Sequence, residues 1–127
     1  MIFKDGSKVK YILGYDLGEQ VSQISYLADH EEEPRTFSLL AGAEAFDIPT
    51  FLAKQRGVNQ WFFGAEAQKQ VQEGRAIPLY GLFTAARRGE EILLDEVSFD
   101  PVALLSLFIK RSLAMLSMEL DPGTIEA

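Results

Sequence analysis

The residues best placed to do chemistry are Asp16 and Gly18, which lie in a short turn between two apolar runs. Residues 11–15 have the composition of a buried strand, and residues 21–27 alternate, imperfectly, as a second strand would. The two runs predict a tight hairpin in which Gly18 can take the positive φ that such a turn often needs. A carboxylate at the end of a central strand projects from the sheet edge, where ligands usually bind. The plain alternative is that Asp16 only caps the turn, and the Asp-x-Gly pattern alone favours that structural interpretation.

Three other groups of side chains are of kinds that act in sites, and each has a simpler interpretation. His30 lies in a charged turn, where a lone histidine is expected to be solvated. The Trp-Phe-Phe run at residues 61–63 could stack on a base or a peptide, but its few basic neighbours favour a place in the core. Arg87 and Arg88 could contact an anion, although the two glutamates that follow closely favour a solvated turn.

The elements that position the hairpin are expected in the first half of the chain. Residues 1–10 are polar and predict a frayed leader that becomes a strand only after position 8. Beyond the hairpin, a charged turn precedes a strand at residues 35–40, so that three antiparallel strands open the chain. Pro49 cannot donate a ladder hydrogen bond and belongs at a strand start or a sheet edge. Gly57 favours a second hairpin, with residues 60–63 as its return strand.

Two helices are predicted in the second half. Residues 65–73 contain good helix formers and are followed by Gly74 as a stop. Asp100 and Pro101 mark the clearest helix start, because aspartate can accept from the first free amides and proline at the first helical position loses no hydrogen bond. This helix should continue to about Met118, and its apolar stripe is so wide that it must pack under the sheet. Four polar positions on it are expected to face water: Ser106, Lys110, Arg111 and Ser117.

Weaker signals predict the remaining segments. Residues 76–86 are apolar but broken by Pro78 and Gly81, so a strand is slightly favoured over an irregular buried segment. Residues 92–94 are expected to be briefly extended, residues 41–47 to form a loop or a single helical turn, and residues 122–123 to form a turn.

Composition and charge exclude several classes of function. The chain has 127 residues, 47% of them hydrophobic, so residues 1–127 are expected to form a single domain. Twelve basic against nineteen acidic residues give a net charge of −7, which disfavours nucleic acid or an anionic membrane as a partner. With no cysteine and one histidine, a disulfide framework is impossible and zinc chemistry is implausible. No signal peptide or bilayer-spanning run is seen, so we expect a cytoplasmic protein.

The stretch Gly14-Tyr-Asp-Leu-Gly-Glu-Gln-Val-Ser22 resembles the first phosphate-binding loop of the actin, Hsp70 and sugar-kinase superfamily, where a strand ending in Gly-x-Asp-x-Gly turns into a second strand. Ile48-Pro-Thr-Phe-Leu52, followed by Phe-Phe-Gly-Ala-Glu-Ala-Gln-Lys-Gln-Val at residues 62–71, looks like the Hsp70 order of a Pro-containing strand, a hairpin and a helix opened by Gly-Ala. The resemblance covers most of residues 11–73 and, more loosely, the helix from residue 101. It implies an α/β fold of the ribonuclease H-like, actin-like ATPase kind, with a mixed sheet, N-terminal antiparallel strands and a packed C-terminal helix.

For the site, the resemblance implies that Asp16 faces a magnesium ion, usually through water, and that Gly18 allows close approach. The backbone amides of Glu19, Gln20 and Val21 would contact the phosphates of ATP. A hard, hydrated cation suits one carboxylate together with phosphate oxygens. The loop departs from the Hsp70 pattern, which has small hydroxyl residues where this chain has Glu19 and Gln20. A carboxylate close to a triphosphate is repelled unless a metal intervenes, so Glu19 either points away or weakens nucleotide binding.

The resemblance also calls for a further parallel strand after the last turn, and we expect the chain to be the first lobe of a longer parent, cut before its last strand. In the superfamily, the second phosphate loop, the adenosine-binding residues and the second lobe come later. We therefore expect ATP and magnesium to bind in the parent, and the remainder of that parent to be the partner of this fragment. The fragment alone is expected neither to bind these cofactors nor to hydrolyse ATP, and no catalytic residue is assigned to it. The alternative is a non-catalytic module that keeps the fold without nucleotide and self-associates through apolar surface. An unrelated small α+β domain is a third possibility.

Overall fold

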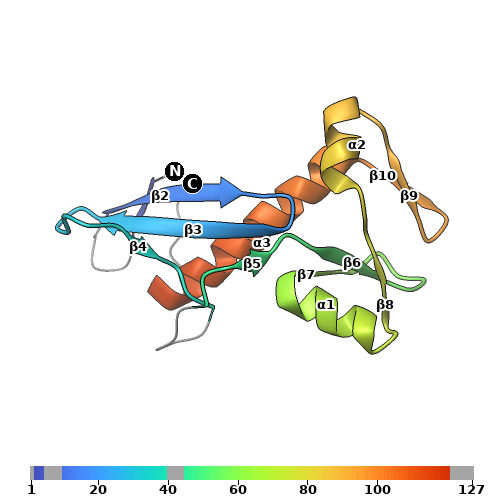
Figure 1. Cartoon of the computed structure of the whole chain (residues 1–127), viewed down its shortest axis with the longest axis horizontal. Coiled ribbons are helices and arrows are strands. Elements are labelled where there is room, and N and C mark those ends of the chain that lie inside the picture. The colour runs from blue at the N-terminus through green and yellow to red at the C-terminus, as the bar shows by residue number, and fades with distance from the viewer. Residues whose placement is uncertain (1, 5–9, 40–44, 121–127) are drawn as a thin grey trace. The chain divides into compact units, whose positions relative to one another are not determined.

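The computed structural model describes residues 2–4, 10–39 and 45–120, which form antiparallel β-sheets and α-helices (Figure 1). The chain divides into two compact units, one made of Met1–Ile48 with Ser112–Ala127 and the other of Pro49–Arg111. Part of the predicted loop at residues 41–47 and the whole predicted turn at residues 122–123 lie outside the described residues. The structure is thus mixed α and β with a C-terminal helix, as expected.

The sheet of the first unit is built around the predicted hairpin, which the structure confirms. Strands β1 (Ile2–Lys4), β2 (Lys10–Leu17), β3 (Val21–Ala28) and β4 (Arg35–Thr36) pair in that order, and β5 (Ile48–Pro49) also pairs with β3. The antiparallel β2–β3 ladder runs from Tyr11 opposite Ala28 to Leu17 opposite Ser22. Strands β2 and β3 are consequently the two inner strands of the β1 to β4 order.

Two expectations about these strands were wrong in part. The leader contains strand β1, which pairs antiparallel with β2 from Ile2 opposite Ile12 to Lys4 opposite Lys10; this strand begins with a β-branched and an aromatic residue, Ile2 and Phe3, which both favour strands. The strand predicted at residues 35–40 is only two residues long. The chain nevertheless stays beside β3 for one residue more, since the buried Phe37 donates its amide hydrogen to the Ile24 carbonyl at 2.7 Å.

The two faces of the β2–β3 pair differ in burial. Side chains alternate between faces along a strand, so Leu13 and Tyr15 lie on one face and Gly14 and Asp16 on the other. Leu13 is buried, and the Tyr15 hydroxyl forms a 2.6 Å hydrogen bond with the hydroxyl of Ser112 in helix α3 (Pro101–Leu120). The buried apolar side chains of this unit are Leu13, Ile24, Ala28, Phe37, Ile48, Leu113 and Leu116.

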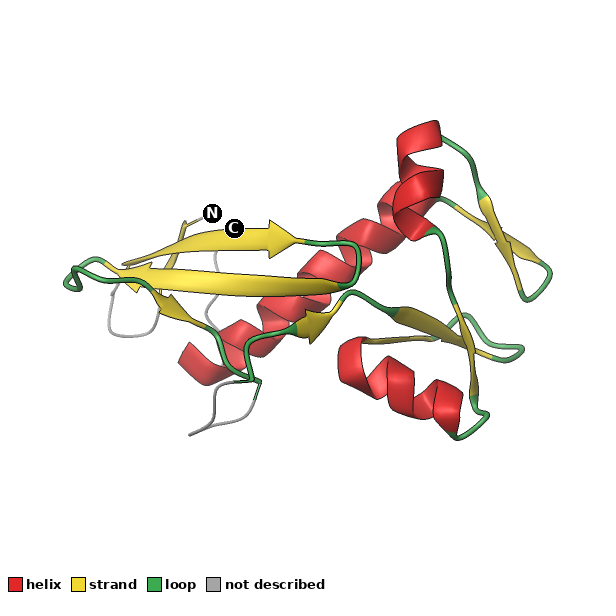
Figure 2. Cartoon of the chain, viewed as in Figure 1, coloured by secondary structure: helices red, strands yellow, loops and turns green. Residues whose placement is uncertain are grey.

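In the second unit, strands β6 (Leu52–Gln55), β7 (Trp61–Phe63) and β8 (Ala76–Pro78) form an antiparallel sheet in the order β7-β6-β8 (Figure 2). Helix α1 (Gly64–Gln72) follows β7 directly, which confirms the predicted hairpin and helix. One buried cluster of this unit consists of Ala53, Ala67 and Ala76, with Phe51, Phe62 and Val71 packed around them. The turn residue Gly57 has φ of 72°, and Gly74 after the helix has φ of 74°, so both need glycine's freedom.

The segment predicted as a strand at residues 76–86 is a strand only at β8, and helix α2 (Leu82–Arg88) follows it. Strand β8 ends at Pro78, although Leu79 still donates its amide hydrogen to the Leu52 carbonyl at 3.0 Å, and left-handed Gly81 and Gly89 bracket a run of helix formers. Arg87 and Arg88 are exposed, as expected, but lie in the last turn of α2 and not in a loop. Strand β9 (Ile92–Leu94) was predicted; its antiparallel partner β10 (Val97–Phe99) was not.

Helix α3 begins where it was predicted, because the Asp100 carboxylate accepts the Val102 amide hydrogen at 3.0 Å. Its Ser106, Lys110 and Arg111 are exposed, as expected. Ser117 is not: it is buried among apolar residues of the last turns, so the assignment of this serine to solvent was wrong. None of the helices within the described residues is long and apolar enough to cross a membrane.

An ion pair between a buried lysine and a partly exposed aspartate joins the β6–β7 hairpin to the β9–β10 hairpin. The Lys54 side chain is 3% exposed, and its Nζ lies 2.7 Å from Asp95 Oδ2, which also accepts the Gly57 amide hydrogen at 2.7 Å. The hydrogen bond from Lys54, followed by that from Gly57, holds the pKa of Asp95 below its ordinary value. Asp95 and Glu96 turn the second hairpin with φ of 53° and 63°, a left-handed conformation that costs energy in residues other than glycine. The ion pair therefore stabilises a turn whose backbone is strained.

We expect the pH dependence of stability to reveal this ion pair. The pKa of Asp95 in the folded chain lies below the ordinary value of 3.8, so the pair contributes fully above that value and is lost as the pH falls through the folded pKa. Asparagine keeps the size of aspartate and tolerates a left-handed backbone. The difference in unfolding free energy between wild type and Asp95→Asn should be constant from pH 7 to about 5 and shrink below about pH 4, measured by urea denaturation. Glu96→Gln makes the same charge change one residue away and is the control. If the difference in unfolding free energy between wild type and Asp95→Asn stayed unchanged down to about pH 2.5, the pair would contribute nothing to stability.

Candidate functional site

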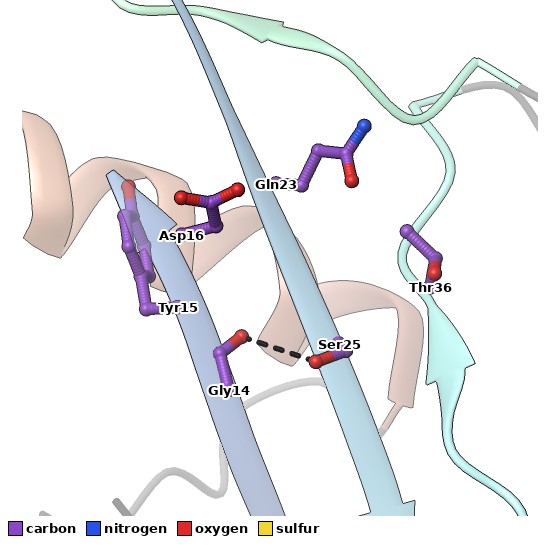
Figure 3. Close-up of a pocket in the computed structure, with 6 residues that line it drawn as sticks. All are labelled: Gly14, Tyr15, Asp16, Gln23, Ser25 and Thr36. Atoms are coloured by element: carbon purple, nitrogen blue, oxygen red, sulfur yellow. Dashed lines mark hydrogen bonds between the residues drawn. The ribbon is translucent and has the colours of Figure 1, made fainter. Parts of the chain in front are cut away.

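A pocket of about 300 Å³ opens on the polar face of the β2–β3 hairpin (Figure 3). The residues that line it are Gly14, Tyr15, Asp16, Gln23, Ser25 and Thr36. Asp16 comes from β2, Gln23 and Ser25 come from β3, and Thr36 comes from β4. Figure 3 shows the Asp16 carboxylate beside β3 and the side chains of Gln23 and Thr36 on the far side of that strand.

Strand register explains why these side chains meet. Asp16 is opposite Gln23 and Gly14 is opposite Ser25, while Ser25 in turn is opposite Thr36. Directly opposite residues in an antiparallel pair share a face, so the three strands deliver a carboxylate, an amide and two hydroxyls to one surface. The absence of a side chain at Gly14 leaves room for Ser25, whose Oγ would lie 2.7 Å from a Cβ at position 14.

Hydrogen bonds fix parts of the lining. The Gln23 Nε2 donates to Asp47 Oδ1 at 2.7 Å, which leaves the amide nitrogen of Gln23 turned toward the segment before β5. Ser25 Oγ donates to the Gly14 carbonyl over a long 3.5 Å. On the opposite face, Tyr15 ties the end of β2 to α3 through Ser112. Burial raises the pKa of Tyr15, against the smaller opposing effect of the Ser112 hydrogen bond, so its hydroxyl stays neutral at physiological pH.

The chemistry available in this pocket is that of oxygen ligands. Asp16 supplies one carboxylate, and the hydroxyls of Ser25 and Thr36 supply neutral oxygens. Across the described part of the chain, no group of three or more His, Cys, Asp or Glu side chains could hold a metal ion. An ion with few protein ligands, such as magnesium, keeps waters and takes its remaining ligands from a phosphorylated substrate. The lining residues of this pocket therefore offer a few oxygen donors, of which only Asp16 is charged.

Of the residues predicted to bind ligand, Asp16 lines the pocket. Gly18, Glu19 and Gln20 form the adjoining turn and Val21 begins β3, and none of these four is among the lining residues. The expectation of a positive φ at Gly18 was wrong. Its need for glycine is steric, because a Cβ there would lie 2.3 Å from the carbonyl oxygen of Val21, three residues on. Gly18 thus allows its own backbone to lie close to the carbonyl oxygen of Val21.

Sequence reasoning missed Gln23, Ser25 and Thr36. For Gln23 and Ser25 a signal was present, since a hairpin turning at residues 18–20 sets which residues of the second strand are opposite Asp16 and Gly14. Thr36 offered no comparable signal, because its position depends on where a separate strand pairs with β3.

Comparison with known proteins identifies a family for most of the chain. Residues 33–127 match the family of unknown function DUF5716, in its C-terminal part, and the chain belongs to that family. The match begins after β3, so the hairpin that carries Asp16 lies before the matched residues. No curated protein and no solved structure matches the chain.

Two glycine substitutions test the packing of the hairpin. Gly18→Ala should lower the free energy of unfolding by about 1–3 kcal/mol, because the clash is with backbone and only a shift of the turn relieves it. Gly14→Ala combined with Ser25→Ala is the matched control: its clash would be with the Ser25 side chain, which that variant removes, so it should cost less than Gly18→Ala. Urea denaturation measures both. Equal stability of Gly18→Ala and wild type would contradict the close approach at Val21.

Proposed function

We propose that this member of the DUF5716 family carries the phosphate-binding half-lobe of an actin-like or Hsp70-like, ribonuclease H-like ATP-binding protein. Asp16 is assigned the role of facing a hydrated magnesium ion that accompanies the nucleotide. The observation that carries the proposal is the place of Asp16 near the end of β2, in a pocket whose other polar side chains are an amide and two hydroxyls.

Two further features support the proposal. The hairpin that holds Gly14, Asp16 and Gly18 has the strand-turn-strand form that the resemblance implies for a first phosphate loop. Downstream, β5 with Pro49, the β6–β7 hairpin and α1 follow one another in the order of the Hsp70-like pattern. The first feature is the shape of one hairpin and the second is the order of elements along the chain, and both agree with the resemblance drawn from the residues.

In this proposal the chain's own groups bind and orient the phosphates. The exposed residues Glu19, Gln20 and Val21 would present their backbone amides to anionic oxygens, and the Asp16 carboxylate would hold a hydrated magnesium ion. Glu19 adds an exposed carboxylate to the same turn, and its charge opposes the approach of a triphosphate. Removing that charge should therefore strengthen nucleotide binding.

Hydrolysis is not assigned to this chain. Phosphoryl transfer needs the metal, the phosphates and the attacking water to be held from several sides. The pocket at Asp16 offers one carboxylate on one side of the ligand. Complete activity would require further groups that close the site from its other sides.

Titration with Mg-ATP tests the proposal on the 127-residue chain. We expect weak binding, with a Kd on the order of 1 mM, seen as NMR shift changes of residues 14–25. Asp16→Asn should abolish the magnesium-dependent part of these shifts, and Glu19→Thr should tighten binding severalfold. Asp29→Asn removes one exposed carboxylate elsewhere in the same unit and is the control, expected to bind as wild type does. Binding that is insensitive to Asp16→Asn would overturn the assignment.

The second candidate function is a non-catalytic module that self-associates. The observation that favours it is the exposure of large apolar side chains, among them Ile12 at 58%, Tyr80 at 74% and Leu93 at 74%. Ile12 and Leu93 both lie in strands, and Leu93 belongs to the two-stranded β9–β10 sheet. Exposed apolar strands are sites at which chains pair with one another.

Sedimentation velocity distinguishes the second candidate. The chain should show a concentration-dependent sedimentation coefficient between about 10 and 500 µM, because weak apolar contacts form only as concentration rises. Leu93→Lys should reduce this association, since a charge on an exposed strand opposes pairing. Thr84→Lys adds the same charge at an exposed position of α2, outside the strands, and serves as control. A monomer over the whole range would exclude self-association.

A further inference from the structure

A second pocket, of about 390 Å³, lies within the Pro49–Arg111 unit and carries two arginines. Its lining residues are Gln55, Arg56, Phe62, Gln70, Gly74 and Arg75. We propose that this pocket binds a phosphate monoester, with the Arg56 and Arg75 guanidinium groups as ligands of the phosphate. The proposal is independent of the Asp16 pocket, which belongs to the other unit.

Strand register brings the two arginines together from segments far apart in sequence. Gln55 at the end of β6 is opposite Ala76 at the start of β8. Arg56 and Arg75 therefore occupy the next position outward, one leaving β6 and the other entering β8. An anion between the two guanidinium groups would attract both of them.

The carboxylates near this pocket do not use up the capacity of its arginines. Arg75 Nη1 lies 2.8 Å from Glu73 Oε2, in a pair whose side chains are 66% and 37% exposed. Such exposed pairs contribute little to stability, so a better anion can replace Glu73. The Asp95 carboxylate, which Arg56 influences only weakly, accepts hydrogen bonds from Lys54 and Gly57. Each guanidinium has five N–H donors, so most remain available to a ligand.

The geometry favours phosphate over carboxylate. A phosphate monoester presents three terminal oxygens and nearly two negative charges, so guanidinium groups from two separate segments can each bind a different pair of oxygens. A carboxylate has one charge and two oxygens in one plane. The pocket volume exceeds that of a phosphate group, and Phe62 supplies an apolar wall for the organic part of the ligand. The acidic chain as a whole repels free anions, so binding must depend on these local contacts.

NMR titration of the full chain with phenyl phosphate tests the proposal, with inorganic phosphate and benzoate as comparison ligands. We expect phenyl phosphate to shift the amide signals of Gly74 and Arg75 and the side-chain amide signals of Gln55 and Gln70. It should bind more tightly than inorganic phosphate, which lacks the ring, and than benzoate, which lacks the third oxygen. Arg56→Gln with Arg75→Gln should weaken binding on the order of tenfold or more.

The matched control is Arg87→Gln with Arg88→Gln, which removes the same charge from α2 in the same unit and should leave the affinity unchanged. Asp16→Asn should also leave it unchanged, which separates this pocket from the proposed nucleotide site. A short phosphoserine peptide distinguishes the source of the phosphate: tighter binding than phenyl phosphate indicates a phosphorylated partner, and weaker binding indicates a small molecule. Equal loss of affinity in both arginine pairs, equal binding of benzoate, or no shifts at 10 mM phenyl phosphate would each overturn the proposal.

Discussion

The antiparallel register of β2 and β3 is the constraint on which the first unit depends. With Asp16 opposite Gln23 and Tyr15 opposite Ile24, one face of the pair carries the pocket, and the other carries the buried Leu13 and Ile24 and the Tyr15 contact with α3. A one-residue slip of β3 would expose Ile24, and a one-residue slip of β2 would bring Asp16 into the core; either slip would lose buried apolar area. The same register therefore forms the pocket and stabilises the strands that hold it.

Contacts across long sequence separations organise the second unit in a different way. Strand β6 lies between β7 and β8, and its buried Lys54 points to a carboxylate 41 residues later in the chain. Close packing comes from small residues, Ala53, Ala67 and Ala76, which allow α1 to approach the sheet. Trp61 and Phe99 meet edge to face, with ring centroids 5.1 Å apart, and add a second contact between the two hairpins.

Local patterns made the main elements predictable, and contacts between distant residues account for what was missed. The hairpin around Gly18 and the start of α3 at Asp100 could be predicted because turn and cap chemistry act over a few residues. Helix α2 was missed because it is a single short helix between two left-handed glycines, in a segment where apolar composition alone does not distinguish a strand from a helix. Asp16 was found from its own turn, whereas Thr36 and Asp95 take their places from strand pairing and an ion pair that no local pattern encodes.

The burial of Lys54 has a consequence for how this fold can vary. The β9–β10 hairpin has only two strands and looks like an insertion that could be shortened or replaced. Its turn, however, supplies the carboxylate for a lysine that has almost no access to water. A deletion of the hairpin would leave an ammonium group buried without a counterion, at a cost far above that of losing the strands themselves. The hairpin and position 54 can therefore change only together: a shorter relative of this chain needs an apolar residue in the middle of β6.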